Sequence, residues 1–143
     1  KVAVGQTVNI SIGGKTDELH GERLEATMTV LSFHNGIFYE TEPRHGGDVS
    51  FDMGRTALVK VDSLTVMLTS KRTAPFSLQQ LLSCGVDLKN FDAIVAKGVH
   101  APVAAYESVC PTRLRVNTPG VTSADLKHFS YQQRRRPLFP FER

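Results

Sequence analysis

The chain has 143 residues, of which 41% are hydrophobic and 22% charged, with a formal net charge of +3. This composition is typical of one globular domain and excludes a disordered chain. The apolar runs are far shorter than the roughly 20 residues of a membrane-spanning helix, and no signal peptide is recognisable. Two cysteines are too few for a disulfide framework, so we expect a cytoplasmic protein without a membrane partner.

The first half of the chain is predicted to be an antiparallel β meander. Apolar and polar residues alternate over residues 7–12 and 24–30, which is the period-two pattern of half-buried strands. Asn35-Gly36, between residues 32–34 and 37–40, is a strong hairpin signal. Two further strands are expected at 57–61 and 64–69, separated by a turn at Asp62-Ser63.

The second half is predicted to form a βαβαβ unit. Ser77 and Gln80 have the spacing of a capping box that begins a helix over 77–84, and Gly85 ends it. Residues 92–97 and 112–117 are expected to be strands, with a helix between them that begins near Pro102 and ends before Pro111. Strands connected in this order are normally parallel. The predicted fold is therefore one mixed α/β domain over residues 1–143, with helices packed on a single mixed sheet. A further T-x-x-D capping pattern at 122–125 predicts one more helical turn.

The carboxyl ends of parallel strands are where open α/β sheets bind ligands. Three loops are expected there, at 69–73, 97–101 and 117–120, and none carries a carboxylate. With two helix amino-termini nearby, they favour an anion such as a carboxylate or phosphate. An ordinary polar loop edge is the alternative interpretation. The candidate substrate- or anion-binding residues are Arg72, Lys97, His100, Lys71, Asn117 and Thr118.

The residues provide no complete catalytic set. The histidines at 20, 34, 45, 100 and 128 do not form H-E-x-x-H or H-x-H patterns or pair with cysteine at ligand spacing. His45 and Asp48 would place only two ligands in one turn. Cys110 lies at a helix end, where the partial charge is negative, so a buried structural thiol is expected. We therefore predict no catalytic residue and no metal or other cofactor in this domain.

The positive charge is concentrated near the end of the chain. From residue 113 onward there are seven basic and two acidic residues, a net of +5, whereas the whole chain carries +3. Arg134, Arg135 and Arg136 could contact nucleic acid, but no nucleic-acid motif accompanies them. A solvated tail, or one that contacts another domain, is the preferred interpretation, and no nucleic-acid partner is expected.

Several motifs occur together in a recognisable order. They are LTSKRTAPFSLQQLLSCGVDL, IVAKGVHAPVAAYESV and RVNTPGVTSADLKHFSYQQRRRPLFPF, preceded by IGGKTDELHG and FHNGIF. Together they resemble the carboxyl-terminal domain of the MlrC family of microcystinase C-like zinc metallopeptidases. Val103 departs from the family pattern, because the family often has arginine at this helix start. If that arginine contacts the substrate or the partner domain, this chain lacks the contact.

The resemblance implies the carboxyl-terminal part of a longer two-domain protein, and the lysine at position 1, in place of methionine, favours the same interpretation. Zinc and the catalytic acid are then expected in an amino-terminal domain, where zinc would activate water for attack on an amide carbonyl. This domain would form one wall of the substrate cleft. The expected substrates are peptides or small amides, including microcystin-type peptides. A non-catalytic module that binds an anionic ligand or partner is the alternative. Apolar surface left uncovered could also form a homodimer.

Overall fold

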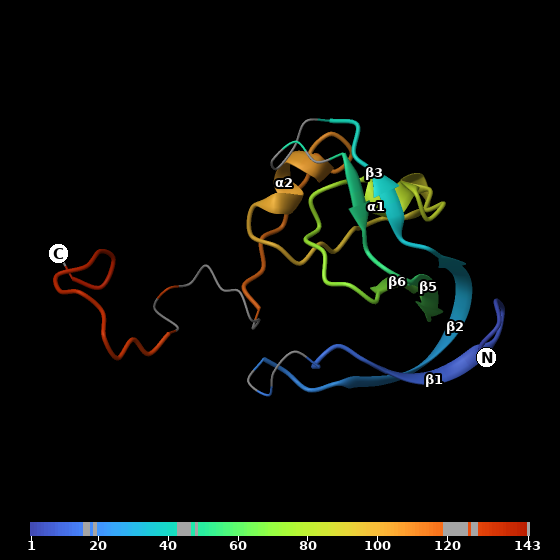
Figure 1. The fold of residues 1–143 in the computed structure, drawn as a ribbon, viewed down its shortest axis with the longest axis horizontal. Coiled ribbons are helices and arrows are strands. Elements are labelled where there is room, and N and C mark those ends of the chain that lie inside the picture. Colours follow the sequence, from blue (N-terminus) through green and yellow to red (C-terminus); the bar gives the residue numbers. More distant parts are fainter. Residues whose placement is uncertain are drawn as a thin grey trace.

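The computed structural model describes residues 1–15, 18, 20–42, 47, 49–118, 126 and 129–142. Its strands form two antiparallel sheets, so the predicted single mixed sheet is wrong (Figure 1). In chain order, the strands are β1 (Thr7–Ile12), β2 (Leu24–His34), β3 (Ile37–Tyr39), β4 (Ser50–Asp52), β5 (Thr56–Val61) and β6 (Leu64–Thr69). The helices are α1 (Gln79–Leu82), the 3₁₀ turn η1 (Leu88–Asn90) and α2 (Ala101–Tyr106). The chain is therefore a mixed α and β structure with few helices.

The larger sheet has four strands in the order β1-β2-β5-β6. Its neighbouring strands are antiparallel, as predicted, and Val61 faces Leu64 across the two-residue turn that joins β5 to β6. One face of the sheet collects Met28, Val30 and Val59, which are buried. The alternating residues Val8, Ile10 and Ile12 of β1 pack against them, which confirms the predicted period-two pattern. β2 bends along its length, and its register with β5 shifts between Val30 and Ser32 (Figure 1).

Asn35-Gly36 is a corner between the two sheets and not a hairpin turn. β2 pairs with β1 and β5, whereas β3 pairs with β4, so the strands on either side of this dipeptide do not pair with each other. The side chain of Asn35 accepts a hydrogen bond from the backbone N–H of Ile37 at 3.1 Å, and Gly36 has φ +75°. Asn-Gly is favoured wherever φ must be positive, and a hairpin is only one such place. The prediction of a hairpin here was therefore wrong.

A second core lies between the small β3–β4 sheet, β5 and α1. It consists of Phe38, Met53, Leu58, Phe76 and Cys84, all buried. Phe51 stacks on Phe38 with ring centroids 5.2 Å apart and meets Phe76 edge-on at 4.7 Å.

The capping box predicted from Ser77 and Gln80 is present at the start of α1. The hydroxyl of Ser77 accepts from the backbone N–H of Gln79 at 3.0 Å, and the Gln80 side chain accepts from the backbone N–H of Ser77 at 3.3 Å. Both residues are buried, and Gly85, with φ +72°, follows the helix as expected. The helix itself is shorter than predicted, because regular α geometry is confined to Gln79–Leu82.

The predicted βαβαβ unit does not form as a sheet within the described residues. β6 pairs antiparallel with β5, and residues 92–97 and 112–117 form no strand. α2 has Pro102 in its first turn, as predicted, but ends at Tyr106 instead of continuing to Pro111. The sequence pattern of a buried strand does occur at 92–97, but the described residues place no strand beside it.

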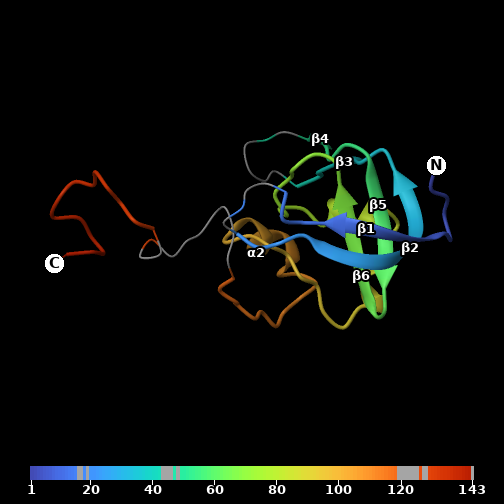
Figure 2. The same ribbon diagram turned by 90° about the horizontal axis from the view of Figure 1, so that it is seen from below.

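The carboxyl-terminal residues 129–142 lie apart from the two sheets in both orthogonal views (Figures 1 and 2). They form a local cluster in which the rings of Phe129 and Phe141 each contact that of Tyr131. The Arg134 guanidinium lies over the Phe141 ring, 4.6 Å from its centroid, and pairs with the carboxylate of Glu142. The predicted helical turn at 122–125 falls outside the described residues.

Candidate functional site

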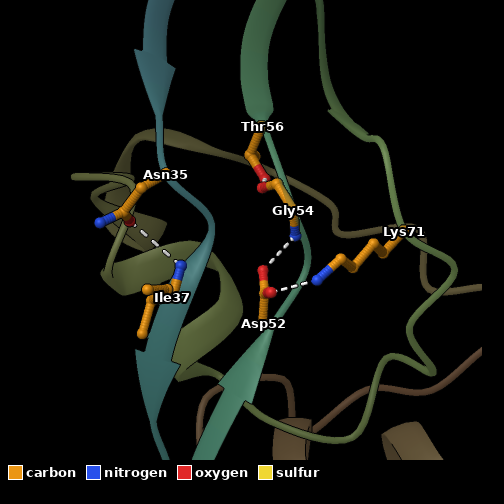
Figure 3. Close-up of polar contacts among 6 residues, drawn as sticks. All are labelled: Asn35, Ile37, Asp52, Gly54, Thr56 and Lys71. Atoms are coloured by element: carbon orange, nitrogen blue, oxygen red, sulfur yellow. Dashed lines mark hydrogen bonds and ion pairs between the residues drawn. The ribbon is translucent and has the colours of Figure 1, made fainter.

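Three loops meet at one end of the β3–β4 sheet: residues 35–36 before β3, residues 53–55 between β4 and β5, and residues 70–72 after β6 (Figure 3). Polar contacts between their residues hold these loops together. The carboxylate of Asp52 accepts from the backbone N–H of Gly54 at 2.6 Å and pairs with the ammonium group of Lys71. Backbone bonds reinforce this, because Lys71 donates to the carbonyl of Met53 at 2.9 Å. The loop after β6 is thus bound to the segment that joins β4 to β5.

Glycine is required at this junction because two backbone segments approach closely. A side chain on Gly36 would overlap the carbonyl oxygen of Gly54, and one on Gly54 would overlap the hydroxyl of Ser70. Both glycines also have positive φ, at +75° and +67°. Thr56, which is buried, donates its hydroxyl to the same Gly54 carbonyl at 3.0 Å. The junction is therefore a rigid support for the Ser70–Arg72 loop.

The ion pair changes what the candidate residue Lys71 can do. The hydrogen bond from Lys71, followed by that from the Gly54 N–H, lowers the pKa of Asp52. Asp52 therefore stays ionised and compensates the charge of Lys71, which is then less available to an incoming anion. Asp52 was not predicted from the sequence, because its partner Lys71 is 19 residues away in the chain. The D-x-G sequence at 52–54, typical of a turn, was the one local indication that Asp52 has a structural role.

The other basic candidates lie on loops that pack against a common core. Gly98 lies beside Pro75, since a Cβ on Gly98 would be 3.4 Å from the Pro75 ring, and Ala101 packs on the Phe38 cluster. The turn that carries Lys97 and His100 therefore adjoins the segment that follows Arg72. His100 is exposed at the N-cap position of α2, and its side chain makes no capping hydrogen bond.

Asn117 and Thr118 are not brought into this arrangement. Both are exposed, and neither forms a hydrogen bond with the described part of the chain. The structure therefore brings together two of the three predicted loops, those at 69–73 and 97–101.

Metal and nucleophile chemistry find no support in the described residues. Among them there is no group of three or more His, Cys, Asp or Glu side chains that could hold a metal ion. The predicted two-ligand turn of His45 and Asp48 lies outside these residues. Burial raises the pKa of the Cys84 thiol, which disfavours its thiolate. Cys110, which was predicted to be buried, is half-buried.

The basic tail is partly neutralised by its own acidic residue. Arg134 makes a two-pronged contact with Glu142, with one N–O distance of 2.6 Å, and the backbone N–H of Leu138 also donates to this carboxylate. These hydrogen bonds lower the pKa of Glu142 to about 2, with Arg134 the largest cause. Arg135 and Arg136 stay exposed. Arg134 is one of the three arginines that could contact nucleic acid, but here its side chain stabilises the local structure of the tail.

A family model described as MlrC C-terminus matches residues 1–133. A crystal structure described as "Putative metallopeptidase" from Mesorhizobium sp. BNC1 has a TM-score of 0.80 and 25% identity, covering 98% of this chain and 28% of that one. No curated protein matches the chain. This chain thus corresponds to little more than a quarter of that solved protein.

No helix in the described part of the chain is long and apolar enough to cross a bilayer. The resemblance found in the sequence motifs is confirmed by the family match, which spans nearly all of the chain. The chain belongs to the MlrC carboxyl-terminal domain family.

Proposed function

We propose that this chain is the carboxyl-terminal domain of a longer metal-dependent hydrolase that cleaves peptides or small amides. The observation that carries the proposal is the family match over residues 1–133. The solved protein described as a putative metallopeptidase supports it, because the match covers only 28% of that longer protein. The linearised microcystin-type peptides associated with the MlrC name are the first substrate class to test.

Zinc is the metal we propose, and its ligands belong to the amino-terminal domain of the longer polypeptide. The described residues do not fit a metal site, because they contain no cluster of three or more ligating side chains. We therefore assign no metal ligand and no step of bond cleavage to this chain. Its two free cysteines support a cytoplasmic location.

The role proposed for this domain is to form one wall of the substrate cleft and to hold the carboxylate of the substrate. Arg72, Lys97 and His100 are exposed on the two adjoining loops. Arginine and lysine are the side chains that pair most readily with carboxylates, and protonated histidine adds a third donor. Lys71 contributes less, because Asp52 already compensates its charge.

The test compares substrates that differ only in the carboxylate. In the longer polypeptide, the triple variant R72A/K97A/H100A should raise KM for a peptide with a free terminal carboxylate and leave KM for its terminal amide unchanged. Lys60→Ala with Lys89→Ala is the matched control, since both lysines are exposed on other elements. Unchanged kinetics with the free-carboxylate peptide would exclude the proposed role. Carboxylate binding without any hydrolysis by the longer polypeptide would favour the alternative of a binding module.

A further inference from the structure

Residues 92–97 and 111–118 carry strand-like sequence, but neither stretch belongs to a helix or a sheet. In the first stretch burial alternates, with Ile94 and Ala96 half-buried and the residue between them, Val95, 91% exposed. One face of this stretch therefore packs on the chain itself, and the other faces outward. This alternation of burial is the pattern of a strand that is covered on one face.

The second stretch is exposed on both faces. Leu114 is 88% exposed and Val116 is 76% exposed, and the intervening arginine is exposed as well. Leucine and valine alternate here with polar residues, as in a strand with one apolar face. The described residues offer no backbone hydrogen-bond partner to residues 111–118. Exposed apolar side chains on a stretch without backbone partners are typical of a surface that another part of a protein covers.

The comparison with the solved protein indicates what covers it. The match includes 98% of this chain, so it extends over both stretches, and the TM-score of 0.80 means that the two chains follow a similar overall path. The match covers 28% of that protein, which leaves 72% of its length (100 minus 28) outside the match. In the solved protein, the region that resembles this chain is therefore accompanied by a much larger part of the same polypeptide, which is available to pack against it.

We propose that residues 92–97 and 112–117 are interface strands that pair with a β-sheet in the remainder of the longer polypeptide. Val95, Leu114 and Val116 then become buried against that part, and the backbone groups of both stretches gain ladder partners. α2, which lies between the two stretches, becomes the crossover of a βαβ unit. The inference rests on the proposed function, because it requires the longer polypeptide.

Amide hydrogen exchange on the longer polypeptide, followed by mass spectrometry, tests this pairing. We expect residues 93–96 and 113–116 to exchange as slowly as β5, at least about 100-fold slower than the exposed turn at Asp62-Ser63. Exchange as fast as in that turn would overturn the inference. The protection should also be independent of protein concentration. Protection that appears only at high concentration would assign the surface to a second copy and would equally overturn the inference.

A double variant tests whether the two stretches share one interface. L114K/V116K in the longer polypeptide should abolish protection in residues 93–96 as well as 113–116, while β2 and β5 stay protected. Leu64→Lys is the matched control, because Leu64 is an exposed leucine in the larger sheet and should leave both stretches protected. Full protection in the double variant would contradict the inference. If that variant does not fold, the exchange of the unmodified polypeptide decides the question.

The exchange measurement also separates this inference from the proposed function. Protected stretches in a polypeptide without metal or hydrolysis would exclude the proposed activity and keep the interface. Unprotected stretches in an active, metal-containing polypeptide would exclude the interface and keep the activity.

Discussion

Gln80→Ala is the substitution that tests most sharply how the second core is held together. The Gln80 side chain is 3% exposed and joins three parts of the structure. Its oxygen accepts from the backbone N–H of Ser77, and its nitrogen donates to the carbonyl of Ala74 at 3.1 Å and to the sulfur of Met53 at 3.8 Å. Removing it leaves the N–H of Ser77, a residue that is 0% exposed, without its acceptor.

The expected loss can be worked out from these contacts. A buried donor left without a partner costs about 1–3 kcal/mol, and the lost bond to the Ala74 carbonyl adds about 1 kcal/mol because water can replace it in part. The free energy of unfolding should therefore fall by roughly 2–4 kcal/mol. Urea unfolding followed by far-ultraviolet circular dichroism measures this change as a lower midpoint at constant m value.

Gln79→Ala is the matched control for this measurement. Gln79 is the adjacent residue of the same helix and has the same side chain, but that side chain makes no hydrogen bond with the described residues. Its replacement should change the free energy of unfolding by less than about 1 kcal/mol. Equal midpoints for the two variants would refute the argument that the buried capping box stabilises this core.

Two further predictions concern the sheet corner and the tail. Gly36→Ala should destabilise the chain more than Gly5→Ala. Both glycines have positive φ, which costs an alanine roughly 1–2 kcal/mol, but only at Gly36 would the new methyl group also overlap a neighbouring carbonyl oxygen. Equal urea midpoints for the two variants would contradict this prediction. Glu142 has a pKa of about 2 in the folded tail, below its ordinary 4.5, so its pairing with Arg134 stabilises the tail above pH 4.5 and is lost as pH falls through about 2. The ring signals of Tyr131 in NMR spectra should follow this transition, and Glu142→Gln should remove it; a transition that persists in that variant would refute the assignment.

The sequence predicted best those features that depend on near neighbours along the chain. The period-two pattern of Val8, Ile10 and Ile12 identified a strand and its inner face, because side chains alternate in any strand. Ser77 and Gln80 predicted the capping box, because its partners are only three residues apart. These local features are encoded without reference to the rest of the fold.

Features that depend on distant partners were predicted less well. Asn35-Gly36 indicates positive φ, but the sequence does not say which strands pair on either side of it. The ion pair of Asp52 with Lys71 joins residues 19 positions apart and has no local signature. The strand pattern at 92–97 is present, but a strand needs a neighbour, and the described residues provide none there.

Metal analysis combined with a peptide-hydrolysis assay, on this chain and on the longer polypeptide in parallel, tests the central claim most directly. The claim is that this MlrC carboxyl-terminal domain belongs to a hydrolase whose metal is held elsewhere in the polypeptide. We predict about one equivalent or more of zinc together with hydrolysis in the longer polypeptide, and neither in this chain alone. Stoichiometric zinc or hydrolysis in this chain alone would contradict the claim, and so would a longer polypeptide that binds no metal.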